Sequence, residues 1–490
     1  MAEFTDRQKE QLRKRAIPED EAHRQLALFE APPTYADLVR ACTVGDGIDA
    51  IPLEGRERLV LLHEQAASQA RFTKFVPASG AATRMFQDLL AGRATGEFIR
   101  NLDRFPFVDD LSAALAARGR ALETLRRSGG EAEIVDALLG SAGLSYATKP
   151  KGLIPFHRGT NGARTPFAEH LAEAAATIRD AEGGGRVHFT VAPEARGAFQ
   201  AHADRERRLY DPMRVEFSTQ HEATDTLAGA TEGGPFTTDS GELVLRPAGH
   251  GALLANLAGL GADLLFVKNI DNVQPETRRA ATILWKKILG GRLVEVARET
   301  HGHVARLRAA DVEPTQVEEA ARFARDRFGL ALPVSLPADA RRRALLDALD
   351  RPIRVCGVVR NTGEPGGGPF WVRTREGQVT RQIVEPAQID PAAAQARATF
   401  RSATHFNPVD LACAMRDAAG ARFDLDRFVD PAASIVTRKS FGGREILALE
   451  RPGLWNGAMA GWLTLFVEVP LETFTPVKTV DDLLRPEHQT

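Results

Sequence analysis

A stretch of small residues near the start of the chain has the composition of a phosphate-binding loop. It follows the apolar run Phe75-Val76, opens with Ala78, Ser79 and Gly80, and ends in Thr83-Arg84. We interpret it as a strand, a tight loop and a helix N-terminus. Small side chains let backbone N–H groups approach an anion, and a guanidinium can add two hydrogen bonds to a phosphate. The alternative is a strand-to-helix turn whose small residues serve packing alone.

A second group of motifs follows about seventy positions later. It reads Lys149-Pro150-Lys151-Gly152, and Thr165-Pro166-Phe167-Ala168-Glu169 opens a helical pattern after it. With these motifs the chain resembles the sugar nucleotidyltransferases, especially the eukaryotic type of UDP-sugar pyrophosphorylase, and most closely a bacterial family of unknown function. The resemblance implies catalytic roles for Arg84 and Lys151. It also implies that the nucleotide is bound by Ala78, Ser79 and Gly80.

The small-residue loop departs from the pattern of the family that it resembles. That family has further glycines before Thr-Arg, whereas this chain keeps only Gly80. Alanine fits poorly wherever the backbone needs a positive φ. We therefore expect the loop to follow a different path from the one in the family.

Two further motifs are expected to contact the nucleotide. The strand-like run Met213–Phe217 leads to Gln220, and the resemblance implies that this amide reads the edge of a uracil base. An amide offers a donor and an acceptor together, which suits that task, but it could equally satisfy a loop backbone. Gly249 and His250 stand where the family has a glycine-rich nucleotide and sugar loop. His250 replaces an Asn there, and could bind the ligand or tie down its own loop.

An acidic residue follows the apolar strand-like run Asp263–Lys268. This residue is Asp271, and the resemblance implies that it holds Mg²⁺ between phosphates. Magnesium favours one or two carboxylates plus substrate oxygens, so a lone Asp is sufficient when a nucleotide is bound. The alternative is an Asx turn that caps a helix starting at Pro275.

The C-terminal third contains the remaining candidate residues. Gln382-Ile383-Val384-Glu385 resembles a strand whose Glu accepts hydrogen bonds from sugar hydroxyls, and His405 follows Thr404 where the family has a sugar-binding Asn. The resemblance therefore implies that Glu385 and His405 bind the sugar, with the sugar's identity left open by Thr404. Pro476-Val477-Lys478 matches an element whose lysine reaches the phosphates, which implies a catalytic role for Lys478.

Strand-like and helix-like segments alternate through most of the chain. This alternation predicts an α/β fold with a doubly wound, mostly parallel sheet, and the resemblance implies a Rossmann-like sheet of the GT-A nucleotidyltransferase type. We expect a helical N-terminal region at 1–70, a catalytic domain at 71–400 with a helical insertion at about 105–145, and a smaller α+β part at 401–490 that closes the site. A helix is expected to run from near Thr165 to Gly183. His63 has no visible partner and is expected to be structural.

Composition excludes several other classes of protein. The 490 residues include 63 Lys and Arg and 65 Asp and Glu, a net charge of -2, so no global basic field points to nucleic acid. Three distant cysteines argue against a disulfide framework and fit a reducing compartment. No apolar run has the length of a membrane span or the form of a signal peptide, so we expect a cytoplasmic protein. The sequence leaves its oligomeric state open.

The reaction that best fits these motifs joins a nucleoside triphosphate, with UTP favoured, to a sugar 1-phosphate and releases pyrophosphate. Such chemistry needs positioning and charge neutralisation rather than a covalent nucleophile, and Mg²⁺ is the expected cofactor. The alternative is a nucleotide-sugar binding protein with weak or no turnover, because the small-residue loop has lost glycines.

Overall fold

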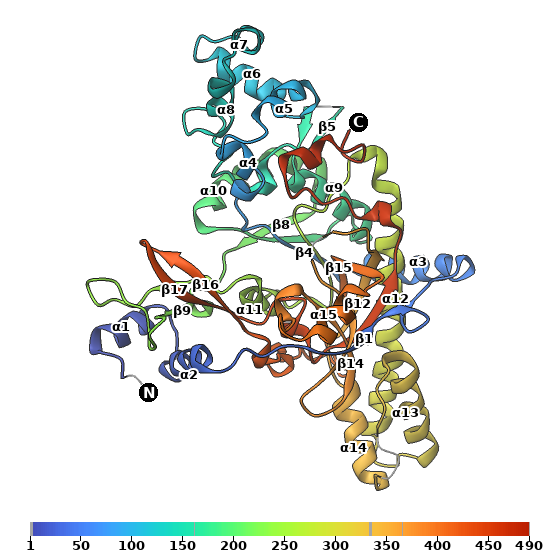
Figure 1. Ribbon diagram of the computed structural model, residues 1–490. Helices are drawn as coiled ribbons and strands as arrows, with labels where there is room; N and C mark the ends of the chain where they lie inside the picture. The colour runs from blue at the N-terminus through green and yellow to red at the C-terminus, as the bar shows by residue number, and fades with distance from the viewer. Residues whose placement is uncertain (1–2, 161, 333–335, 365, 490) are drawn as a thin grey trace. The chain divides into compact units, whose positions relative to one another are not determined.

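The computed structural model describes residues 3–160, 162–332, 336–364 and 366–489, and its helices and strands are shown in Figure 1. The chain divides into two compact units, each built from three segments. Unit 1 comprises Met1–Arg58, Gln220–Leu265 and Leu289–Glu468. Unit 2 comprises Leu59–Thr219, Phe266–Ile288 and Val469–Thr490.

Unit 2 contains a row of neighbouring strands, three of which consist almost entirely of buried residues, whereas the outer strand is only partly buried. Their spatial order is β11 (Leu264–Lys268), β4 (Phe72–Pro77), β7 (Arg186–Thr190), β8 (Arg214–Ser218). β4 pairs with β7 in register Phe75 to His188, and β7 continues the parallel pairing to β8. A strand that is buried on both faces reads as a continuous apolar run, which is why β11, β4 and β7 were visible in the sequence. Their carboxyl ends lie at one edge and lead into the loops of the candidate site.

Helices make up most of the rest of unit 2. They are α3 (Leu53–Ser68, entering from unit 1), α4 (Gln87–Leu90), α5 (Thr95–Arg100), α6 (Val108–Ala116), α7 (Leu122–Ser128), α8 (Glu131–Leu139), α9 (Pro166–Thr177) and α10 (Arg196–Tyr210). Helices α5 to α8 gather at the top of Figure 1 around a buried aromatic cluster that includes Phe98, Phe105 and Phe107. The C-terminal residues Val477, Val480 and Leu483 pack into the same core. A short hairpin, β5 (His157–Gly159) with β6 (Gly162–Arg164), completes this unit.

Unit 1 contains three groups of strands. The first has the order β2 (Thr43–Val44), β3 (Gly47–Asp49), β18 (Leu463–Glu468), β12 (Ile353–Arg360), β15 (His405–Ala414). β12 is parallel to β18 but antiparallel to β15. The second group is β1 (Asp37–Ala41), β13 (Gly368–Arg373), β14 (Val379–Val384). The third is β10 (Leu245–Arg246), β9 (Thr226–Gly229), β17 (Arg444–Glu450), β16 (Ile435–Phe441).

The helices of unit 1 come from all three of its segments. They are α1 (Asp6–Lys14), α2 (Glu19–Glu30), α11 (Leu253–Gly259), α13 (Pro314–Phe328), α14 (Ala338–Leu349) and α15 (Ala394–Arg401), and α12 (Arg279–Arg308) runs from unit 2 into unit 1. α13 and α14 lie side by side at the bottom of Figure 1. Thr5 caps α1, and its hydroxyl accepts a hydrogen bond from the Gln8 N–H. No helix in the described ranges is long and apolar enough to cross a membrane.

The predicted mixed α/β class, with parallel strands and flanking helices, is confirmed. Two local predictions are wrong. Residues 37–49 were expected to be helical but form β1, β2 and β3, strands too short to show a periodic pattern. The helix from Thr165 ends at Thr177 rather than near Gly183, because the Asp180 carboxylate binds the N–H of Gly184 in a turn before β7.

Candidate functional sites

The loop after β4 lies against the segment that contains Lys151. The Ala82 N–H donates to Lys149 O at 3.1 Å, and the Lys151 N–H donates to Gly80 O at 3.2 Å. Thr83 Oγ1 donates to Ala147 O at 3.0 Å. Two motifs separated by about seventy residues therefore form one backbone-paired surface in unit 2.

Lys151 joins two further motifs to this surface. Its Nζ lies 2.9 Å from Asp271 Oδ2 and donates to Val477 O at 2.7 Å. The Val477 N–H in turn donates to Asp271 O at 3.1 Å. The lysine side chain is 14% exposed and the aspartate side chain 25%, so the pair is sheltered yet open to solvent. Of the sequence-predicted residues, the structure thus brings Gly80, Lys151 and Asp271 together with the segment that leads into Lys478.

The backbone of the small-residue loop suits the alanines that replace the family's glycines. Between Ala78 and Arg84 no residue has a positive φ, so alanine is compatible with every position there. Ala78 is buried and its N–H binds Thr190 O, while Ser79 and Gly80 are exposed. The backbone of the loop can therefore receive a ligand although only one glycine remains.

The element after the loop is weaker than the predicted helix. Ala82–Arg84 form one 3₁₀ turn, and α4, which follows, has only four residues. The predicted helix N-terminus directly after the loop is therefore wrong, and a helix as short as α4 adds little dipole field at its own N-terminus. Arg84 is exposed at the end of the 3₁₀ turn. Its guanidinium lies next to the loop in sequence and remains a candidate phosphate ligand.

Asp271 does not cap a helix. The next helical turn is Glu276–Arg278, whose N-cap residue is Pro275 and which has no side-chain cap. The Asp271 side chain instead binds the Lys151 ammonium. Within the described residues no group of three or more His, Cys, Asp or Glu could hold a metal ion. A magnesium ion at Asp271 would therefore depend on substrate phosphate oxygens for its other ligands, which is the coordination that Mg²⁺ favours.

Lys478 begins the C-terminal turn of unit 2. Its N–H and that of Thr479 both donate to Asp482 Oδ2, at 2.7 and 2.8 Å. Together with the bond from Val477 to Asp271, these contacts fix the backbone of Lys478 beside the Lys151 site. Its side chain is partly exposed.

A buried charge cluster, which sequence reasoning missed, lies in the same unit. It is centred on Glu173 of α9, whose two carboxylate oxygens bind Lys74 Nζ at 2.8 Å and Lys268 Nζ at 2.6 Å. Lys286 Nζ lies 4.0 Å from the same carboxylate. All four side chains are at most 4% exposed. Nothing in the local sequence distinguishes these lysines from ordinary surface charges.

The glycine-rich candidate motif forms a different cluster, within unit 1. Gly249 has φ +75°, and a Cβ on Gly251 would meet Pro452 O at 2.2 Å, so both positions need glycine. Between them His250 stacks on the Trp455 indole with ring centroids 4.1 Å apart. The Leu454 N–H donates to His250 Nδ1 at 2.9 Å. The neutral ring therefore carries its proton on Nε2.

Glu385 belongs to the cluster around His250. Its Oε1 accepts the Trp455 Nε1–H at 2.9 Å, and its own N–H donates to Gln388 Oε1. Gln388 Oε1 also accepts from Asn456 Nδ2 at 2.9 Å. Burial lowers the pKa of His250, and the Glu385 carboxylate opposes that shift. Trp455, Gln388 and Asn456 had no predicted role, because only the fold shows that they surround Glu385.

The two remaining candidates make separate contacts in unit 1. Gln220 Nε2 donates to Asp225 Oδ1 at 3.3 Å. Burial raises the pKa of that carboxyl, against the lowering effect of Arg15. His405 is buried, and its Nε2 lies 3.3 Å from Glu468 Oε1. No recorded contact joins His405 to the Glu385 cluster among the residues that the structure describes.

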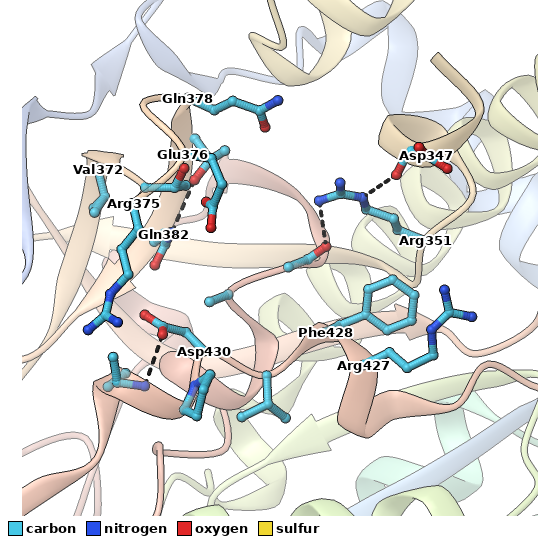
Figure 2. A pocket seen from close by; sticks show the side chains of 18 of the residues that line it. Asp347, Arg351, Val372, Arg375, Glu376, Gln378, Gln382, Arg427, Phe428 and Asp430 are labelled. Atoms are coloured by element: carbon cyan, nitrogen blue, oxygen red, sulfur yellow. Dashed lines mark hydrogen bonds between the residues drawn. The ribbon is translucent and has the colours of Figure 1, made fainter. Parts of the chain in front are cut away.

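A large groove in unit 1, of about 1520 Å³, lies apart from most of these residues. Figure 2 shows side chains of both charges facing it, among them Arg375, Arg427, Glu376 and Asp430. Arg351 on its wall donates to backbone carbonyls at Asp347 and Gly461. Gln388, which contacts Glu385 and Asn456, lines this groove. Its mixed charge does not select one class of ligand.

Comparison with known proteins adds two findings. The model of a family described as "Domain of unknown function (DUF4301)" matches residues 5–489. No curated protein sequence matches the chain.

Among solved structures, the chain is similar to the uridine diphosphate N-acetylglucosamine pyrophosphorylase from Trypanosoma brucei. The two are 14% identical with a TM-score of 0.50, over 95% of this chain and 74% of that one. A variant of UDP-glucose pyrophosphorylase from Leishmania major is also similar, at 14% identity and a TM-score of 0.47 over 98% and 79% of the two chains. At this identity the likeness to the first structure shows the fold, and the predicted resemblance is confirmed at that level.

Proposed function

We propose that this chain, which belongs to the DUF4301 family, is a nucleotidyltransferase that forms a nucleotide sugar and pyrophosphate from a nucleoside triphosphate and a sugar 1-phosphate. The proposal favours UTP as the nucleotide, since the chain shares its fold with a protein named as a uridine diphosphate N-acetylglucosamine pyrophosphorylase. The observation that supports it most is the Lys151–Asp271 pair at 2.9 Å beside the Gly80 loop.

The arrangement suits transfer of a nucleotidyl group. An oxygen of the sugar 1-phosphate would form a bond to the α-phosphorus of the triphosphate, and the bond between that phosphorus and the bridging oxygen would break to release pyrophosphate. Negative charge on the phosphates must be neutralised throughout, which is electrostatic work that a lysine ammonium can perform. Lys151 would supply that charge, while the exposed backbone of Ser79 and Gly80 would hold phosphate oxygens.

Asp271 has two tasks in this proposal. It orients the Lys151 ammonium through the 2.9 Å contact, and its carboxylate would hold Mg²⁺ together with phosphate oxygens. The ion would supply charge neutralisation between phosphates when it is bound. Arg84 and Lys478 would add positive charge from the two segments next to this pair.

The His250–Glu385–Trp455 cluster of unit 1 is proposed to contact the nucleotide or sugar. Its chemistry fits hydroxyl groups, since His250 offers the Nε2–H donor and Glu385 offers a carboxylate acceptor next to an indole. Gln220 is proposed to read the base, in competition with its bond to Asp225. His405 is proposed as a further sugar ligand.

A catalytically inactive nucleotide-sugar binding protein is the second candidate. The loss of glycines from the loop suggested it, but the loop has no position that requires one between Ala78 and Arg84. That observation favours the enzyme.

A pyrophosphate-release assay tests the proposal. The chain is incubated with Mg²⁺, each of UTP, GTP, CTP and ATP, and a panel of sugar 1-phosphates. We expect release that depends on both substrates, and loss of release in Lys151→Ala. Nucleotide-sugar binding without release from any pair would support the binding protein instead.

A further inference from the structure

We propose that His170 is a positioning residue that holds the turn Asn269–Asp271 in place, and through it the Asp271 carboxylate opposite Lys151. This inference rests on the proposed function for its catalytic consequence, but its structural part stands by itself. His170 lies on α9 and is fully buried. Its Nε2 lies 3.1 Å from Asn269 O and 3.3 Å from Ile270 O.

The direction of these hydrogen bonds follows from the partners. Carbonyl oxygens only accept, so Nε2 must carry the proton and donate to both. Nδ1 has no hydrogen-bond partner and remains a bare acceptor in the core. Burial, with Lys74 nearby, lowers the pKa of His170 well below its usual value, which keeps the ring neutral. The histidine is thus a fixed single-proton donor aimed at the turn.

A second contact presses the same turn against the Lys151 segment. A Cβ on Gly152 would lie 3.1 Å from Ile270 Cγ1 and equally close to the Phe199 ring, so Gly152 packs directly on Ile270. His170 and Gly152 therefore hold Ile270 from two directions. Lys151 directly precedes Gly152, and Asp271 directly follows Ile270. The packing of Gly152 on Ile270 therefore places the side chains of Lys151 and Asp271 opposite each other.

The backbone at His170 is itself held in place by a hydrogen bond. Its backbone carbonyl accepts a hydrogen bond from Lys74 Nζ at 3.1 Å, and Glu173 lies one turn further along α9. Lys268, which Glu173 binds, is the residue immediately before Asn269. The turn is thus anchored at its start by Lys268 and at its middle by His170. Neither anchor touches the surface where substrate would bind.

The chain offers a matched control in His63. This histidine is also buried, its Nε2 binds a backbone carbonyl at Thr177 O at 2.7 Å, and its Nδ1 also lacks a partner. The two histidines thus differ mainly in what they hold, a helix-end carbonyl in one case and the Asp271 turn in the other. A general loss of core packing should affect both variants alike.

Hydrogen exchange of the full chain tests the structural part without any substrate. We compare His170→Leu, His170→Gln and His63→Leu by mass spectrometry of peptides covering 269–275 and 474–480. We expect His170→Leu to speed exchange at Asn272 and Val477 at least tenfold, with much less change in His63→Leu. His170→Gln should restore protection, since its amide can donate to the same carbonyls. Equal exchange at this turn in both Leu variants would overturn the proposal.

Kinetics test the catalytic part. His170→Leu should lower kcat for pyrophosphate release tenfold or more with a smaller effect on KM, and in the Asp271→Asn background it should have almost no further effect. Additive losses in the double variant would show that His170 does not act through Asp271. If the unaltered chain releases no pyrophosphate, the proposed function fails, and the exchange data still decide the role of His170. Should His170→Leu fail to fold, His170→Gln against His170→Asn gives the same contrast, because the shorter Asn amide cannot reach the turn.

Discussion

Replacing Glu173 by Gln should destabilise unit 2 severely, whereas replacing Lys74 by Met should not. Glu173 is the carboxylate that binds the buried ammoniums of Lys74 and Lys268, with Lys286 4.0 Å away. Breaking a buried ion pair by removing one partner typically costs about 3–5 kcal/mol, because it leaves an uncompensated charge. Here one carboxylate lies within 4.0 Å of three lysine ammoniums. We therefore expect Glu173→Gln to cost at least the upper part of that range at pH 7.

Lys74→Met should behave differently because the cluster has more positive than negative groups. Burial, with Lys268 and Lys286 nearby, lowers the pKa of Lys74 from 10.5 to about 7, against the pull of Glu173. At 1.36 kcal/mol per pKa unit, keeping this lysine charged costs roughly 4–5 kcal/mol. Methionine removes that net cost, which already includes the contact with Glu173, and loses the hydrogen bond to His170 O, worth about 1–3 kcal/mol. The variant should be at least as stable as the unaltered chain at pH 7.

The dependence on pH gives an independent check. The Lys74 pKa is lower in the folded chain than in the unfolded chain, so between pH 7 and pH 10.5 the unfolded chain binds more protons. The free-energy cost of burying the charged Lys74 is complete below pH 7 and disappears as the pH rises to 10.5. Lys74 therefore makes the unaltered chain more stable toward high pH. The free energy of unfolding of Lys74→Met should lack this rise with pH. The stability that the variant gains over the unaltered chain should therefore vanish near pH 10.

Urea denaturation at pH 7 and pH 9.5 measures these differences. Hydrogen exchange of residues 72–77 identifies the transition that belongs to this cluster. Unfolding of Glu173→Gln at the same urea concentration as the unaltered chain would refute the reasoning. So would a Lys74→Met variant that is less stable than the unaltered chain by 3 kcal/mol or more at pH 7.

Three further predictions concern the candidate sites. Lys151→Ala should lower kcat/KM for pyrophosphate release by several orders of magnitude while the chain still folds, because the ammonium would neutralise phosphate charge in the transition state. Normal activity would remove Lys151 from the mechanism. Gln220→Glu should weaken the preference for UTP by roughly 1–3 kcal/mol if the amide binds uracil, and it should place a second carboxylate next to that of Asp225. An unchanged base preference in competition assays would make Gln220 structural. Glu385→Gln should raise KM for the sugar 1-phosphate more than it lowers kcat, because it removes a carboxylate that would accept hydrogen bonds from sugar hydroxyls and leaves the Lys151 site unchanged. An effect on kcat alone would argue against contact between Glu385 and the sugar.

The parts of the fold that the sequence predicted are those with strong local signals. The buried strands around Phe75 and Val187 read as apolar runs, and the motifs at Gly80, Lys151 and Asp271 follow short strands or turns whose ends meet in unit 2. The resemblance that these motifs carry implied a shared site, and the structure brings Gly80, Lys151 and Asp271 together. The Asx-cap alternative at Asp271 could be rejected only from the contacts of that side chain.

Other features depend on contacts between distant segments and had no local signal. Lys74, Glu173 and Lys268 look like ordinary charges in the sequence, and they are buried only because α9 packs over β4 and β11. His170 directly follows the motif Thr165–Glu169 but binds carbonyls about a hundred residues later. The strands at 37–49 were missed because two to five residues are too few to show alternation. Likewise, the 3₁₀ turn at Ala82–Arg84 has the composition of a helix start.

Transfer of a radioactive label tests the central claim most directly. UTP labelled at the α-phosphorus is incubated with the chain, Mg²⁺ and the sugar 1-phosphate that supports the fastest pyrophosphate release, and products are separated by chromatography. A nucleotidyltransferase must place the label in a nucleotide sugar and release one unlabelled pyrophosphate for each label transferred, with none transferred by Lys151→Ala. Label that stays in UTP, or appears only in UMP, for every sugar 1-phosphate offered would contradict the account.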